Sequence, residues 1–148
     1  MDLYRTDNAI IRWFKNISIP AARGALFIVF FWFGVLKLIG VSPAETLVQD
    51  LFVRTISFIP FDTFYFLFAI YECVIGILFL IPRATRTVIL LLAIHMVSTF
   101  LPLVLMPEIT WAGFLIPTLE GQYIIKNLVI IALAMGIAAE VTPMTRRS

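Results

Sequence analysis

Cysteine and histidine are almost missing from this sequence, and their scarcity excludes several chemistries. The chain has one cysteine, Cys73, and one histidine, His95. An intramolecular disulfide is therefore impossible, and a dithiol redox enzyme would need thiols from a partner. One histidine cannot supply bis-histidine haem ligation, and no His, Cys and Asp cluster has metal-ligand spacing. We therefore expect no haem and no metal ion.

Charge is also scarce. Only 14% of the 148 residues are charged and 61% are hydrophobic, with a mean hydropathy of +1.03. In soluble domains about 25% of residues are charged and about 45–50% are apolar. This composition predicts one membrane domain covering residues 1–148, with no room for a soluble catalytic domain. The few cations lie at the ends of apolar segments and form no basic stripe, so nucleic-acid binding is not expected.

Four apolar segments are long enough to cross a bilayer, which requires about 20 helical residues. We predict an all-α membrane protein, a bundle of four transmembrane helices, and a proline kink at Pro102 in the third helix. The expected spans cover residues 21–40, 63–82, 87–106 and 123–140.

Two shorter segments predict helices at the membrane surface. Residues 1–20 mix apolar and basic side chains, which is typical of an amphipathic interfacial helix, with Trp13 as an anchor. Pro20 favours a break before the first span, although a simple extension of that span is the alternative. Residues 44–58, between the first two spans, have approximate helical periodicity and predict a short surface helix.

The distribution of cations predicts that both termini are cytoplasmic. Cations are frequent before the first span, between the second and third, and after the fourth, whereas the other two connections are poor in them, with Arg54 as the exception. The cations that set this orientation are Arg5, Arg12, Lys15, Arg23, Arg83, Arg86, Arg146 and Arg147.

Glu72 is the residue on which any mechanism would depend. It lies near the middle of the second span, where a charge costs at least about 2.5–3.5 kcal/mol and therefore needs a partner. Side chains lean toward the N-terminus of their helix, so Glu72 and Lys37 lean toward each other from antiparallel spans. We rank Lys37 first, His95 second and Lys126 third as partners of Glu72.

The first span carries a stripe that faces other helices. Arg23, Phe27, Phe30, Gly34 and Lys37 recur at helical spacing, which predicts one face turned toward neighbouring helices. Both cations could instead extend to their own membrane interface, and we favour that interpretation for Arg23.

Two interpretations of Glu72 remain open. In the first, Glu72, His95 and Lys37 line an outward-opening polar pocket for a proton-coupled ligand such as a quinone headgroup, because histidine and a buried carboxylate can exchange protons near neutral pH. In the second, Glu72 pairs internally and specifies helix packing, and His95 is hydrogen-bonded and inert.

Several short motifs, in this order and spacing, resemble the DoxX-like family of small four-helix membrane proteins, in the branch related to the reactive-chlorine-resistance membrane protein RclC. The motifs are Arg23 followed by Phe33-Gly34 and Lys37-Leu38; Glu72 with Gly76, Leu78, Leu80 and Arg83; and Gly121-Gln122-Tyr123-Ile124-Ile125-Lys126-Asn127-Leu128. The resemblance implies a four-helix bundle in a bacterial inner membrane. Some relatives look like subunits or neighbours of quinone-linked oxidoreductases, and others are tied to oxidative-stress resistance.

The sequence and the resemblance together lead to one functional hypothesis and two alternatives. The hypothesis is a quinone- or redox-linked accessory subunit that assembles in the lipid bilayer with itself or with redox partners. The alternatives are a structural or assembly subunit without catalysis, and a channel or carrier for a small solute or protons. The candidate proton acceptor and relay are Glu72 and His95, and the candidate ligand-binding residues are Lys37, Arg23, Tyr71, Lys126 and Asn127.

Overall fold

The chain folds into four long apolar helical segments. The computed structural model describes residues 3–56 and 58–142. Within them, four helical segments are long and apolar enough to cross a membrane, so the chain is a multi-pass membrane protein. The segments are α1 (Leu3–Leu38); α3 (Phe61–Phe79); the 3-10 turn η1 (Pro82–Ala84) with α4 (Thr85–Phe100) and α5 (Pro102–Leu105); and α7 (Leu119–Ile125) with α8 (Asn127–Ala139).

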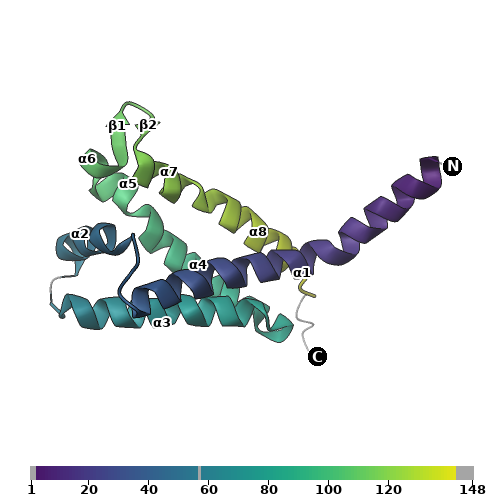
Figure 1. Ribbon diagram of the computed structural model, residues 1–148, viewed down its shortest axis with the longest axis horizontal. Coiled ribbons are helices and arrows are strands. Elements are labelled where there is room, and N and C mark those ends of the chain that lie inside the picture. The colour runs from purple at the N-terminus through teal and green to yellow at the C-terminus, as the bar shows by residue number, and fades with distance from the viewer. Residues whose placement is uncertain (1–2, 57, 143–148) are drawn as a thin grey trace, which may run out of the picture.

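The four segments run alternately up and down, so both ends of the described chain lie at the same end of the bundle (Figure 1). The opposite end carries α2 (Glu45–Thr55), α6 (Pro107–Thr110) and a small hairpin of β1 (Trp111–Gly113) and β2 (Ile116–Pro117). We call these the terminal end and the α2 end. The sequence did not predict the hairpin, because its strands are too short to give an alternating pattern.

The predicted break at Pro20 is wrong. Pro20 lies inside α1, which continues for 36 residues. Proline removes one backbone hydrogen bond, but its fixed φ is compatible with a helix and membrane helices commonly tolerate it. Residues 3–16 are exposed, and this part of the helix projects beyond the rest of the bundle (Figure 1).

The other predicted spans match the observed helices apart from their boundaries. The second helix covers Phe61–Phe79, and the third is interrupted at Leu101, next to Pro102, where the proline predicted a kink. The fourth begins at Leu119 and is interrupted at Lys126. A short helix also forms between the first two spans, within the predicted range 44–58.

α1 and α3 pack closely because two glycines lie between them. A Cβ atom added at Gly34 would be 2.6 Å from the Cys73 sulfur and 2.8 Å from the Ala69 carbonyl oxygen. One added at Gly76 would be 2.8 Å from the backbone nitrogen of Phe31. Small residues allow membrane helices this approach, which supplies van der Waals contact where lipid offers no hydrophobic driving force.

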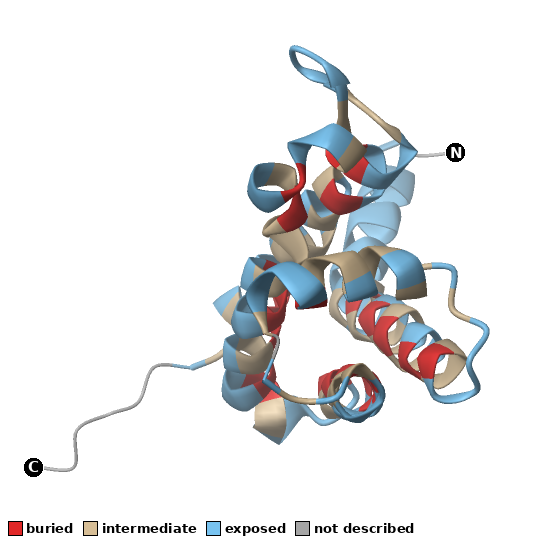
Figure 2. Cartoon of the chain, turned by 90° about the vertical axis from the view of Figure 1, so that its left-hand side faces the viewer, coloured by how far each residue is buried: buried red, intermediate tan, exposed pale blue. Residues whose placement is uncertain are grey.

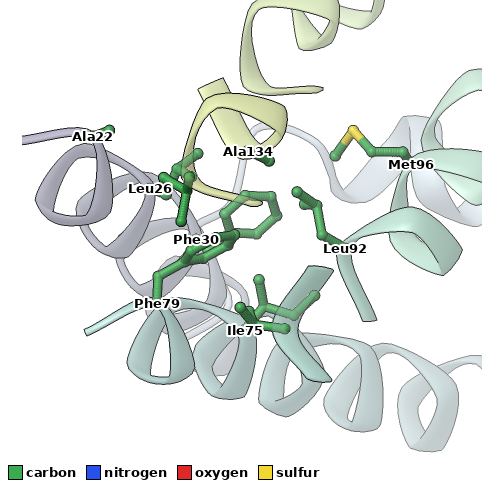
Figure 3. Packing of buried hydrophobic residues seen from close by; sticks show 10 residues of the cluster. Ala22, Leu26, Phe30, Ile75, Phe79, Leu92, Met96 and Ala134 are labelled. Atoms are coloured by element: carbon green, nitrogen blue, oxygen red, sulfur yellow. The ribbon is translucent and has the colours of Figure 1, made fainter. Parts of the chain in front are cut away.

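An apolar core joins α1 and α3 to α4 and α8. Figure 3 shows Phe30, Ile75, Phe79, Leu92 and Ala134 converging from these four helices. Figure 2 shows that the buried residues lie mainly on the helix sides that face other helices. This core holds α4 in the position from which His95 meets α3.

Candidate functional site

Glu72 lies in the interior of α3, inside the bundle. At a rise of about 1.5 Å per residue, Glu72 lies about 16 Å along the helix axis from Phe61, the first residue of α3. Glu72 is only 5% exposed. Its Oε2 atom accepts a 2.6 Å hydrogen bond from Nζ of Lys37, which lies in the last turn of α1 and is also buried. The carboxylate therefore has a cationic partner from the neighbouring helix.

The glycine contact explains how this pair forms. Gly34 lies about one helical turn before Lys37 and packs on Ala69 and Cys73, the residues three before and one after Glu72 in α3. Close approach of the two backbones brings the lysine and the carboxylate within hydrogen-bonding distance. The stripe predicted on the first span is confirmed for Phe30, Gly34 and Lys37, which are all buried, whereas Arg23 and Phe27 are half-buried.

His95 of α4 contacts the second oxygen of the same carboxylate. Its Nε2 atom lies 3.1 Å from Oε1 of Glu72, and its Nδ1 atom lies 3.1 Å from Oγ1 of Thr99, one turn later in α4. The ring stacks on Phe68 at 5.3 Å between centroids, and Phe30 meets it edge-on at 5.3 Å. Glu72 is thus held between a lysine and an imidazole that is itself hydrogen-bonded on its far side.

The structure confirms Lys37 and His95 as partners of Glu72 and does not support Lys126. Lys126 is exposed, and its Nζ atom lies over the Tyr123 ring at 4.8 Å. The half-buried Asn127 follows it, and no hydrogen bond or ion pair among the described residues joins either one to Glu72. Lys126 leans toward the N-terminus of its own segment, which directs it away from the carboxylate.

Arg23 and Tyr71 bind protein groups in other places. Arg23 donates from Nη1 to the Phe79 carbonyl oxygen at 3.0 Å and from Nη2 to Oγ1 of Thr85 at 2.6 Å. It therefore joins α1 to the end of α3 and the start of α4 at the terminal end. The interpretation that the Arg23 side chain simply extends to the membrane interface is wrong, because it binds these protein groups. The Tyr71 hydroxyl donates to the Leu91 carbonyl oxygen at 2.6 Å, and its ring lies 6.1 Å from that of His95.

Three residues near the site did not appear among the sequence candidates. Thr99 and Phe68 contact His95 directly. Thr99 lies one turn after His95 and Phe68 one turn before Glu72, and this helical spacing is the signal that could have identified them. Tyr65 is the third. Among the described residues its buried hydroxyl makes no hydrogen bond of ordinary length, although the Ser42 side chain lies near it. Tyr65 lies two turns before Glu72 on the same face of α3.

Glu72, Lys37 and His95 are all buried. Two cavities among the described residues lie elsewhere: one of about 630 Å³ is lined by apolar residues of α4, α5 and α8, and one of about 660 Å³ includes Arg23, Thr85 and Glu140. Neither is lined by Glu72, Lys37 or His95, so the open polar pocket expected around Glu72 is not one of these cavities. In the described ranges, no group of three or more His, Cys, Asp or Glu side chains could hold a metal ion.

A proton is the species that this arrangement suits best. An ionised Glu72 accepts from Lys37 on one oxygen and from Nε2–H of His95 on the other, which satisfies the carboxylate inside a low-dielectric environment. A proton can then occupy either Glu72 or His95 without moving a heavy atom. Comparisons with protein families, with curated proteins and with solved structures found no match to this chain.

Proposed function

We propose that this protein is a DoxX-like accessory subunit of a redox system in a bacterial inner membrane, in which Glu72 accepts and releases a proton coupled to quinone chemistry. The observation that carries the proposal is the buried Glu72 carboxylate held between Lys37 at 2.6 Å and His95 at 3.1 Å. Ionisable residues buried at this depth in membrane helices usually mark proton or ligand pathways. The resemblance described above contributes the quinone and oxidative-stress part of the proposal.

The residues have different roles in this proposal. Glu72 is the proton acceptor, Lys37 stabilises its ionised form, and His95 relays the proton. Glu72, Lys37 and His95 are buried and contact one another directly, so a quinone headgroup would bind beside them. Tyr71, whose ring lies near His95, belongs to this site, whereas Arg23, Lys126 and Asn127 lie outside it and would affect a ligand only indirectly.

The cation distribution supports an orientation with both termini in the cytoplasm and the α2 end outside. Of the residues used for that argument, Arg146 and Arg147 lie outside the described residues. The exposed start of α1, with Trp13 and Lys15, fits a segment that continues α1 through the cytoplasmic lipid headgroups. α2 fits a helix lying on the outer membrane surface. Assembly with a second copy or with redox subunits belongs to the same proposal.

Purified protein in lipid nanodiscs tests the proposal through the binding of a quinone analogue. We expect wild-type protein to bind the analogue and Glu72→Gln to weaken binding or abolish its pH dependence, because the amide cannot accept the proton. Glu120→Gln is the matched control, since Glu120 is an exposed carboxylate of α7. In cells, Glu72→Gln should lower oxidant tolerance and Glu120→Gln should not. Absence of analogue binding together with unchanged tolerance in Glu72→Gln would refute the proposal.

The burial of Glu72, Lys37 and His95 favours one alternative, a structural or assembly subunit in which Lys37 and Glu72 fix the α1–α3 contact. In that case Glu72→Gln should reduce stability or complex yield while leaving analogue binding unchanged. Proteoliposome flux that depends on Glu72 would instead favour a carrier.

A further inference from the structure

The His95 ring is held so that its two nitrogens keep fixed partners. Phe68 stacks on it with planes 9° apart, and Phe30 meets it at 85°. A ring flip would separate Nε2 from Glu72 and Nδ1 from Thr99. A change in protonation must therefore be absorbed by the hydrogen-bond partners while the ring stays in place.

Thr99 is the partner that can absorb this change. Its Oγ1 atom lies 3.1 Å from Nδ1 of His95 and 2.9 Å from the backbone carbonyl oxygen of the same residue. The hydroxyl hydrogen can point at either acceptor by rotating about one bond, because a hydroxyl is both donor and acceptor. The neighbouring Ser98 already donates to the His95 carbonyl oxygen at 2.7 Å.

Two hydrogen-bonding states follow from these distances. With a neutral ring protonated on Nε2, that nitrogen donates to ionised Glu72 and Thr99 donates to Nδ1. When one further proton enters, it binds Nδ1. The ring then either keeps its Nε2 proton and is an imidazolium, or passes that proton to Glu72 and is neutral. Nδ1–H then donates to Thr99, whose hydroxyl hydrogen turns to the His95 carbonyl oxygen. Each state leaves the buried polar atoms of this pair hydrogen-bonded.

We propose that Thr99 is a positioning residue whose hydroxyl reverses its hydrogen bond to His95 and so lets the Glu72–His95 pair take up one proton. The inference rests on the proposed function, since it describes how the same site handles its proton. The other titratable groups around the Glu72–His95 pair are Lys37 of α1 and three residues of α3. Tyr71 donates its hydroxyl to the Leu91 carbonyl oxygen, and Tyr65 and Cys73 lie near Glu72. Among the described residues, no charged side chain of α8 contacts the ring.

The test is solid-state NMR of histidine-labelled protein in lipid bilayers. His95 is the sole histidine of the chain, so histidine labelling reports this one ring. We expect the neutral ring to carry its proton on Nε2 and the site to gain an Nδ1–H signal as the pH is lowered. Removing the hydroxyl with Thr99→Val should lower the midpoint of that transition by about one pH unit, because Nδ1–H loses its acceptor.

Two further variants separate this role from packing. Thr99→Ser keeps the hydroxyl and should restore the wild-type midpoint. Ser98→Ala removes the competing donor to the His95 carbonyl oxygen and should not lower the midpoint. An unchanged midpoint in Thr99→Val, or an equal shift in Ser98→Ala, would overturn the inference while the proton site at Glu72 stands. Wild-type protein gives a second reading that needs no variant: a neutral ring protonated on Nδ1 would also overturn it. A site that gains no proton at any pH at which the protein stays folded would refute both the inference and the proton part of the proposed function.

Discussion

The buried Lys37–Glu72 pair allows the strongest quantitative prediction. At 2.6 Å between Nζ and Oε2, the gross attraction is about 6 kcal/mol at an effective dielectric constant of about 20. The cost of removing both charges from water cancels much of this, so the net value of the pair is small. Removing only one partner costs much more stability, because the other charge stays buried and unpaired.

Single and double substitutions separate these terms. We expect Lys37→Met and Glu72→Gln each to lower the free energy of unfolding by about 3–5 kcal/mol. The double variant should lie within about 1–2 kcal/mol of wild type, because neither charge remains and the amide at position 72 can still accept from His95. The double-mutant cycle should therefore give a coupling energy of several kcal/mol.

Unfolding by sodium dodecyl sulfate in mixed micelles, followed by helix content, measures these free energies. The exposed pair of Arg54 and Glu108 is the control, and its cycle should give a much smaller coupling energy because solvent screens the charges. A double variant as unstable as the sum of the two single variants would refute the reasoning, since the charges would then not interact across the α1–α3 contact.

Three further predictions test other contacts. Gly34→Ala should destabilise the protein by about 1–3 kcal/mol by forcing α1 away from α3, whereas Gly136→Ala, where an added Cβ meets nothing within 4 Å, should not destabilise it in the same unfolding assay. Tyr65→Phe should leave stability unchanged or raise it by up to about 1–3 kcal/mol, since it deletes a buried hydroxyl that makes no hydrogen bond of ordinary length among the described residues; a loss of stability would show that the hydroxyl binds something. The pKa of Glu108 is held below its usual value by a hydrogen bond from its own backbone N–H and then by Arg54. Its stabilisation is therefore complete above the ordinary carboxyl pKa and is lost as pH falls through the lowered value. We expect the hydrogen-exchange protection of α2, relative to the intrinsic rate at each pH, to fall in acid, and Arg54→Ala to reduce that fall.

The partners of Glu72 show how far sequence reasoning could reach in the site. Antiparallel spans and the lean of side chains toward the helix N-terminus were enough to predict that Lys37 and Glu72 meet, and the 2.6 Å contact confirms it. The same rule correctly ranked Lys126 last. The role of Glu72 as a proton acceptor stays a prediction, because contact geometry alone does not measure proton transfer.

Arg23 and Pro20 show where that reasoning failed. The sequence allowed Arg23 to extend to lipid headgroups, but the end of α3 offers it a carbonyl oxygen and the start of α4 a hydroxyl. Those groups come from residues more than 50 positions away, which no local pattern identifies. Pro20 predicted a boundary from local sterics alone, and α1 continues through it.

By itself, the sequence determined that this chain is a multi-pass membrane protein, because long uncharged apolar segments have no other stable environment. It also determined that Glu72 must be paired, since an isolated buried carboxylate is too costly. Only the tertiary structure decided how the pairing is completed. The glycine contacts of α1 and α3 set the distance to Lys37, and the apolar core positions α4 so that His95 reaches the second oxygen and Thr99 the far side of its ring. These contacts join residues far apart in the sequence. They depend on differences of a few tenths of an ångström in the distance between helices, and helical periodicity does not predict that distance.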